Sequence, residues 1–162
     1  MKQMFLQEGS SSSTIDSKGR FQLPASILRE IPTELEGRFV INRSSEKCLT
    51  LYPINVWNSY KAQLSKVNTF KPEMRRAVRY FMGSATEIKL DSKNRLLIPQ
   101  PLQEYACLEK ELLITTLNTF IEIWNPRLYN EEMNVFSETK PEIIDQLADI
   151  IFEDGKFLDN IS

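Results

Sequence analysis

The sequence predicts an α+β fold built from one β-hairpin module that is used twice. A ten-residue phrase at residues 15–24, IDSKGRFQLP, returns at residues 90–99 as LDSKNRLLIP. Two further blocks follow in the same order, with residues 35–41 matching 108–114 and residues 49–53 matching 121–125. Helical patterns lie between and after the two copies. A repeat of this length indicates one supersecondary unit used twice, so the function is expected to belong to the pair.

Each phrase predicts a hairpin turn, and the first hairpin is expected over residues 14–23. Asp16 suits the first position of a type I turn, and Gly19 suits the fourth, where a left-handed residue makes the bulge of a short hairpin loop. Asp91 and Asn94 take these positions in the second copy. Asn is the non-glycine residue that best tolerates the left-handed conformation. These four residues are therefore predicted to orient the two turns.

The remaining elements follow in order along the chain. Residues 1–13 end in four serines and predict a flexible lead-in. Pro24 and Pro101 each open a short helix, because proline suits a first helical turn. We expect helices at 25–31, 53–67, 71–82, 101–108, 126–138 and 141–152, and strands at 39–41, 49–52, 112–116 and 119–124. The last ten residues are predicted to be a tail.

This order of elements gives four segments. The first module spans residues 10–57, and connecting helices occupy residues 58–83. The second module spans residues 84–127, and C-terminal helices with an acidic tail occupy residues 128–162.

Two of the predicted helices are amphipathic. Apolar residues at i, i+4 and i+7 predict a packed face on the helix at 71–82; they are Met74, Val78 and Phe81. Three arginines project from the rest of that helix; they are Arg75, Arg76 and Arg79. They could either contact phosphate or form ion pairs with a neighbouring subunit. The helix at 141–152 places four aliphatic residues opposite an acidic back; they are Ile143, Leu147, Ile150 and Ile151.

Composition excludes several classes of protein. The 162 residues are 41% hydrophobic and 26% charged, as in soluble globular proteins. No apolar run approaches the ~20 residues that a membrane span needs. The first residues lack the long apolar region of a signal peptide. Cys48 and Cys107 are isolated, which favours a reducing cytoplasm and gives no zinc or redox spacing.

The chain contains no histidine, which removes the usual general base and the commonest metal ligand. We therefore expect no catalytic residues, no metal and no cofactor. An aspartic-protease arrangement of Asp16 and Asp91 is disfavoured. Each aspartate is followed by Ser and then Lys, and the lysine cation would depress the pKa of the carboxylate.

The near-neutral total charge of −2 conceals an uneven distribution. Residues 1–100 carry 16 Lys and Arg against 9 Asp and Glu, whereas residues 101–162 carry 4 against 13. A basic front part suits a protein that meets a polyanion. Acidic residues that merely solvate C-terminal helices would give part of the same pattern.

Strand alternation separates the side chains of the first phrase into two sets. Residues two apart share a face, so Lys18, Arg20 and Gln22 are predicted to point outward. Phe21 and Leu23 are then predicted to point into the core.

The second copy repeats this arrangement, with Lys93 and Arg95 outward and Leu96 and Ile98 inward. Two such hairpins about a pseudo-twofold axis would present two Lys–Arg pairs. A two-stranded ribbon fits the DNA major groove, and Arg with Lys supplies phosphate and guanine contacts. The alternative is that these charges keep hairpin edges soluble. The same pattern in both copies favours binding.

The ordered combination of motifs resembles the MraZ proteins, bacterial transcriptional regulators of the division and cell-wall gene cluster. The resemblance covers roughly residues 4–135. It rests on the two phrases, on CLTLYP at 48–53 followed by Trp57, on RYFMGSATE at 79–87, on Tyr105-Ala106 and on FIEIW at 120–124. Each piece alone is a weak signal, but the ordered set is specific.

The resemblance implies two tandem SpoVT-AbrB-type modules interlocked into one pseudo-twofold, β-barrel-like unit with peripheral helices. It implies that Lys18, Arg20, Lys93 and Arg95 contact double-stranded promoter DNA. It also implies a homo-oligomeric ring, which would multiply weak contacts along repeated promoter boxes. The expected protein is thus a repressor that acts in the cytoplasm on the nucleoid.

A protein-interaction scaffold is the competing hypothesis. In that case a ring would present the acidic C-terminal helix to another protein. The operator sequence, the ring size and the role of residues 138–162 do not follow from the sequence.

Overall fold

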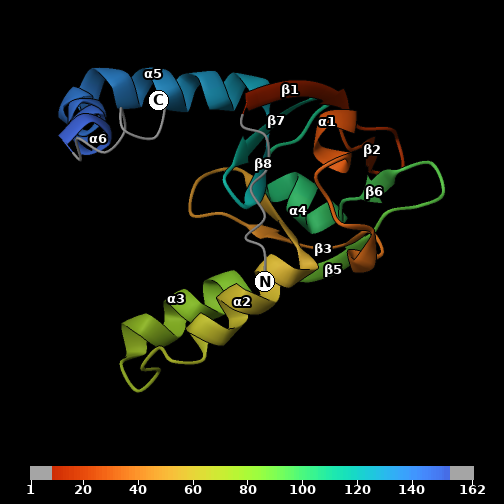
Figure 1. Ribbon diagram of the computed structural model, residues 1–162, viewed down its shortest axis with the longest axis horizontal. Helices are drawn as coiled ribbons and strands as arrows, with labels where there is room; N and C mark the ends of the chain where they lie inside the picture. Colours follow the sequence, from red (N-terminus) through yellow and green to blue (C-terminus); the bar gives the residue numbers. More distant parts are fainter. Residues whose placement is uncertain (1–8, 154–162) are drawn as a thin grey trace, which may run out of the picture. The chain divides into compact units, whose positions relative to one another are not determined.

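The computed structural model describes residues 9–153 (Figure 1). The chain divides into two compact units, residues 1–126 and residues 127–162. The first unit holds every described strand and helices α1 to α4, and the second consists of α5 and α6. The predicted lead-in at residues 1–8 and the predicted tail from residue 154 lie outside the described residues.

The first unit is built on an antiparallel sheet with the strand order β1-β7-β8-β4-β3-β5. Its strands are β1 (Gly9–Thr14), β3 (Arg38–Arg43), β4 (Leu49–Pro53), β5 (Thr86–Lys89), β7 (Glu111–Leu117) and β8 (Phe120–Trp124). The short strands β2 (Arg20–Gln22) and β6 (Arg95–Leu97) pair with each other as a separate β2–β6 ribbon. The fold is therefore α+β, as predicted. A closed barrel is not seen among the described strands, because β1 and β5 are the two edges of an open sheet.

Part of the predicted flexible lead-in is a strand. Residues 9–14 pair antiparallel with β7 from Gly9 opposite Thr116 to Thr14 opposite Glu111. The lead-in prediction is wrong over residues 9–13, because backbone hydrogen bonds to β7 order a segment whose small polar side chains gave no strand signal. A polar edge strand also limits edge-to-edge association with other chains.

The strands that flank each turn pair mainly with the other repeat. The strand before the first turn, β1, pairs with β7, and the strand before the second turn, β5, pairs with β3. Only an isolated bridge between Ile15 and Phe21 closes the first hairpin locally. A hairpin with such short arms is marginal by itself. The arms instead gain hydrogen bonds and buried area from partners distant in the sequence.

The main core lies between the β2–β6 ribbon, one face of the sheet, and the helices α1 (Ala25–Leu28) and α4 (Gln100–Tyr105). Phe21, Leu23, Leu96 and Ile98 are all at most 1% exposed, so the inward half of the predicted alternation is correct. A smaller cluster covers the other face of β3, where Val40 packs with residues of α2 (Ile54–Leu64).

Several helices are shorter than the sequence pattern indicated. Helix α1 ends at Leu28, three residues before the predicted end at residue 31, where Pro32 disfavours a helical conformation of the preceding residue. Helix α2 begins after Pro53, which is the last residue of β4. A 3₁₀ turn at Thr33–Leu35 was not predicted. No helix in residues 9–153 is both long and apolar enough to cross a membrane.

The predicted packed face of helix α3 (Pro72–Met82) is not buried in the single chain. Met74 is 48% exposed, Val78 and Phe81 are half-buried, and no described residue of α3 is buried. Phe70, just before the helix, is 93% exposed. The predicted amphipathic pattern is present, but among the described residues this face has no complete partner. In Figure 1, α2 and α3 extend away from the sheet.

The second unit consists of α5 (Pro126–Thr139) and α6 (Pro141–Glu153), close to the predicted bounds. The aliphatic stripe predicted on the last helix is present but exposed; it comprises Ile143, Leu147, Ile150 and Ile151, with Ile144 beside them.

Candidate nucleic-acid interface

The first turn is organised by the carboxylate of Asp16. Its Oδ1 accepts hydrogen bonds from the backbone N–H groups of Lys18 and Arg20, both at 2.9 Å. Its Oδ2 accepts a charge-assisted bond of 2.8 Å from Nε of Arg20. Gly19 closes the loop with its N–H on the Asp16 carbonyl, and its φ of 86° is in the left-handed region that glycine adopts at little cost.

The second turn repeats these contacts. Asp91 Oδ1 accepts from the N–H groups of Lys93 at 2.8 Å and Arg95 at 2.9 Å, and its Oδ2 accepts from Nε of Arg95 at 2.8 Å. Asn94 has a φ of 59°, so it adopts the left-handed conformation that the substitution pattern indicated. Two loops that lie 75 residues apart in the sequence thus have the same internal hydrogen bonds.

Both aspartates are held in the charged form. The pKa of Asp16 is lowered chiefly because the backbone N–H of Arg20 donates to its carboxylate, and the arginine side chain adds to this. The pKa of Asp91 is lowered in the same way by Arg95. Each carboxylate is therefore a fixed anion that sets the direction of its arginine.

Each arginine keeps most of its donors available. Nε is used by the aspartate, and the terminal NH₂ groups make no hydrogen bond within residues 9–153. The Arg20 and Arg95 side chains are about one third and one quarter exposed. Lys18 and Lys93 are exposed and make no ion pair in the described part of the chain. The arrangement offers fixed, forked cations that can bind phosphate or the acceptor edge of guanine.

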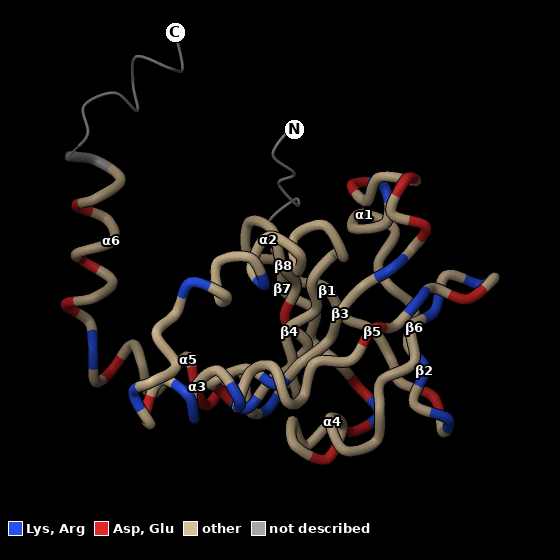
Figure 2. The backbone as a smooth tube through the Cα atoms, turned by 90° about the horizontal axis from the view of Figure 1, so that it is seen from below, with Lys and Arg blue, Asp and Glu red and all other residues tan. Residues whose placement is uncertain are grey.

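The two turns are bonded to each other's strands. The carbonyl of Gly19 accepts from the N–H of Ile98 at 2.9 Å, and the carbonyl of Asn94 accepts from the N–H of Leu23 at 3.4 Å. Antiparallel pairing of β2 with β6 then places one turn at each end of the ribbon. Figure 2 shows Lys and Arg segments beside Asp or Glu segments around β2 and β6. The four predicted basic residues therefore lie on one structural unit.

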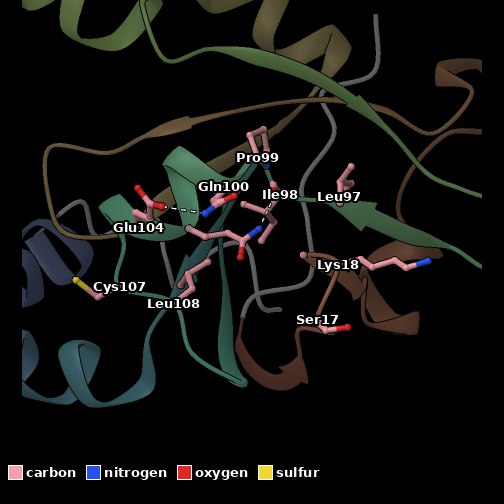
Figure 3. Close-up of a pocket in the computed structure, with 11 residues that line it drawn as sticks. Ser17, Lys18, Leu97, Ile98, Pro99, Gln100, Glu104, Cys107 and Leu108 are labelled. Carbon is pink, nitrogen blue, oxygen red and sulfur yellow. Dashed lines mark hydrogen bonds between the residues drawn. The ribbon is translucent and has the colours of Figure 1, made fainter.

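The first turn also rests against α4. An open cavity of about 520 Å³ is lined by Lys18 of the first turn and by Gln100, Gln103 and Glu104 of α4. Gln103 donates from Nε2 to the Ile98 carbonyl at 2.7 Å (Figure 3). Lys18 points away from the labelled side chains of α4 in this view. The glutamine thereby holds the end of β6, where the N–H of Ile98 donates to the Gly19 carbonyl of the first turn.

The arginines of α3 are not brought to the ribbon. Figures 1 and 2 both place α3 well apart from β2 and β6. Arg75, Arg76 and Arg79 are exposed, and Arg75 donates to the Thr69 carbonyl at 3.1 Å. Whether they contact phosphate or a neighbouring subunit stays a prediction.

A pair of tyrosines, whose contact was not predicted, ties α3 and α4 to the loop between β3 and β4. The hydroxyls of Tyr80 and Tyr105 are 2.6 Å apart and hydrogen-bonded to each other, and both lie within hydrogen-bond distance of the Ser44 carbonyl, at 3.1 and 2.8 Å. The Arg43 guanidinium lies 4.1 Å from the Tyr80 ring centre, a cation–π contact. Burial, together with the bond to Tyr80, raises the pKa of Tyr105 to about 12. The pair forms only when residues of three elements meet, so local patterns could not reveal it.

One group of potential metal ligands occurs in residues 9–153. Carboxylate and sulfur atoms of Glu46, Cys48 and Glu122 lie within 4.8 Å of one another. The Cys48 thiol donates to Glu122 Oε2 at 3.5 Å, and burial raises the pKa of that thiol. A buried, protonated thiol beside a carboxylate is a poor metal ligand at neutral pH.

The fold and the site define an α+β protein with an antiparallel sheet and two equivalent Asp-anchored basic turns. The model of the MraZ family, described as antitoxin-like, matches residues 4–80 and again residues 81–142. The chain belongs to the MraZ family.

Several relatives are named transcriptional regulator MraZ. The protein of Thermomicrobium roseum is 32% identical over 148 residues, covering 91% of this chain and 100% of the relative. That of Cytophaga hutchinsonii is 37% identical over 123 residues, covering 76% and 82%. That of Histophilus somni is 42% identical over 119 residues, covering 72% and 78%.

Proposed function

We propose that this protein is a transcriptional regulator that binds double-stranded promoter DNA through the β2–β6 ribbon and its two turns. The observation that carries the proposal is the pair of equivalent turns, each with an arginine fixed by an aspartate through a 2.8 Å bond. Preorganised donors lose little side-chain entropy when they bind. The name shared by the relatives supports the same function.

The four basic residues take different roles in this proposal. Lys18 and Lys93 neutralise phosphates, which gives affinity without sequence information. Arg20 and Arg95 present their free NH₂ groups to base edges. Tandem SpoVT-AbrB-like modules, interlocked about a pseudo-twofold axis, would hold the two turns in this relation.

Oligomerisation is part of the proposal because four cations bind DNA only weakly. A homo-oligomeric ring would present many ribbons to a row of promoter repeats and raise the effective concentration. The exposed apolar surface at Phe70 and Met74 supports a further packing partner for α3. The protein would then act in the cytoplasm, on the nucleoid, as a repressor of the division and cell-wall gene cluster.

A protein-interaction scaffold is the second candidate function, and one observation favours it. Helix α6 exposes an aliphatic stripe next to Glu142, Asp145 and Asp149. Such a face suits a basic amphipathic partner helix.

Gel shifts at several salt concentrations, on the DNA upstream of the protein's own gene, test the DNA hypothesis. Arg20→Ala and Arg95→Ala should each weaken binding about tenfold, since one good base contact supplies about 1–3 kcal/mol. Lys61→Ala removes one exposed charge from α2 and serves as the matched control. If both arginine variants bind that DNA as the wild type does, the hypothesis is lost. Light scattering checks the ring separately, and a stable monomer would contradict it.

A further inference from the structure

The outward face of the β2–β6 ribbon carries two side chains to which neither the fold nor the proposed cation contacts give a role. The pairing register places Arg20 opposite Leu97 and Gln22 opposite Arg95. The intervening pair, Phe21 and Leu96, points into the core. Gln22 and Leu97 therefore share a face with the two arginines.

Both side chains face solvent in the single chain. Leu97 is 52% exposed, although its neighbours Leu96 and Ile98 are at most 1% exposed. Gln22 is exposed, and its side-chain amide has no hydrogen bond within the described residues. An exposed leucine in the middle of a basic surface adds nothing to solubility, so a contact outside the chain is the better explanation.

The dimensions of this face match a few base pairs. Two residues along a strand advance about 7 Å, which is about two base-pair steps of 3.4 Å. The bonds from Ile98 to Gly19 and from Leu23 to Asn94 bracket the two outward pairs. The outward pairs are therefore of the non-hydrogen-bonded kind, in which the side chains of opposite strands are closest. Each arginine thus stands next to one of the two unassigned residues.

The chemistry of the two residues differs in a way that base edges can distinguish. A glutamine amide can donate and accept at once, which matches N6 and N7 of adenine in the major groove. A leucine has only apolar surface, which matches the methyl group of thymine. The two halves of the ribbon would therefore prefer different bases at equivalent positions.

We propose that Gln22 and Leu97 read base edges, and that the difference between them makes each protomer select an asymmetric DNA element. This inference rests on the proposed DNA-binding function. The lysines and arginines are the same in both turns, so the basic residues alone would prefer a DNA element with nearly twofold symmetry. The outward neighbours of the arginines break that symmetry.

Selection from a library of randomised DNA duplexes, followed by sequencing, tests the inference. The wild type should select an element whose two halves differ. Leu97→Gln gives both strands the same outward residue and should shift the selected element toward an inverted repeat. Gln22→Leu should shift it toward the other inverted repeat. Gln22→Ala and Leu97→Ala should each lower the preference for one base pair about tenfold.

Lys18→Ala is the matched control, because losing a phosphate contact should weaken binding to all sequences alike. Circular dichroism melting should show an unchanged fold, since both positions are exposed. If Leu97→Gln and Gln22→Leu still bind DNA and select the same element as the wild type, this inference is overturned and the proposed function is not. Failure of the wild type to bind any duplex would overturn the proposed function and this inference with it.

Discussion

The two turns have the same internal hydrogen bonds but different surroundings. Gly19 of the first turn is buried, and its carbonyl accepts a 2.9 Å hydrogen bond from the N–H of Ile98. Asn94 is exposed, and the corresponding bond is 3.4 Å. Gln103 bonds to Ile98 and lies against Gly19 of the first turn, whereas the repeat offset of 75 places the apolar Leu28 at the equivalent position. The Asp–Arg geometry is thus encoded locally, while the tolerance of each turn to substitution depends on its neighbours.

The largest expected effect comes from the buried pair beneath the ribbon. Phe21→Ala should lower the free energy of unfolding by about 4 kcal/mol, and Leu96→Ala by about 3 kcal/mol, because each leaves a cavity in a packed core. Chemical denaturation at one fixed protein concentration measures both values. Near-equal, small losses below about 1 kcal/mol would show that the two strands do not share one core.

Exchanging the fourth residue of each turn should show how the surroundings of the two turns affect the stability of the protein. Gly19→Asn should destabilise the protein by about 2 kcal/mol, because a Cβ at this position would displace the Gln103 amide from its bond to the Ile98 carbonyl and come within 3.1 Å of that carbonyl. Asn94→Gly should change the stability by less than about 1 kcal/mol, since glycine adopts the left-handed conformation readily. Thermal melting of the two variants measures the difference. Equal destabilisation would contradict the role given to Gln103.

The smallest expected effect concerns acid stability, where the two turns should behave alike. Both aspartates have lowered pKa values in the folded state. Their stabilisation is therefore present above the ordinary pKa of the carboxyl and is lost as the pH falls through the lowered pKa. The free energy of unfolding of the wild type should decrease below about pH 4. Asp16→Asn with Asp91→Asn should be less stable at pH 7 and show a shallower decrease in acid.

Denaturation curves at pH 7 and pH 3 check this prediction. Glu131→Gln is the control, because it removes a carboxylate from an exposed ion pair on α5. Parallel pH profiles for the wild type and the double aspartate variant would show that these carboxylates do not stabilise the turns.

Much of the site could be predicted because it depends on short-range rules. The left-handed conformations of Gly19 and Asn94 follow from turn chemistry. The inward positions of Phe21 and Leu96 follow from a period of two. The same alternation also places Leu97 outward, and an exposed leucine in that position was the available signal for a contact outside the chain. That the basic residues bind DNA stays a prediction.

The sequence by itself determined the duplication, which is visible as repeated residue patterns. It also determined the two turns, the inward and outward residues after each turn and the amphipathic helices, since each of these depends on residues a few positions apart. Tertiary structure alone decided that a serine-rich segment becomes β1, that β2 pairs with β6, and that Tyr80 meets Tyr105. These contacts join residues 25 to more than 100 positions apart. Their stability comes from backbone hydrogen bonds and buried area supplied by distant partners, which no local pattern records.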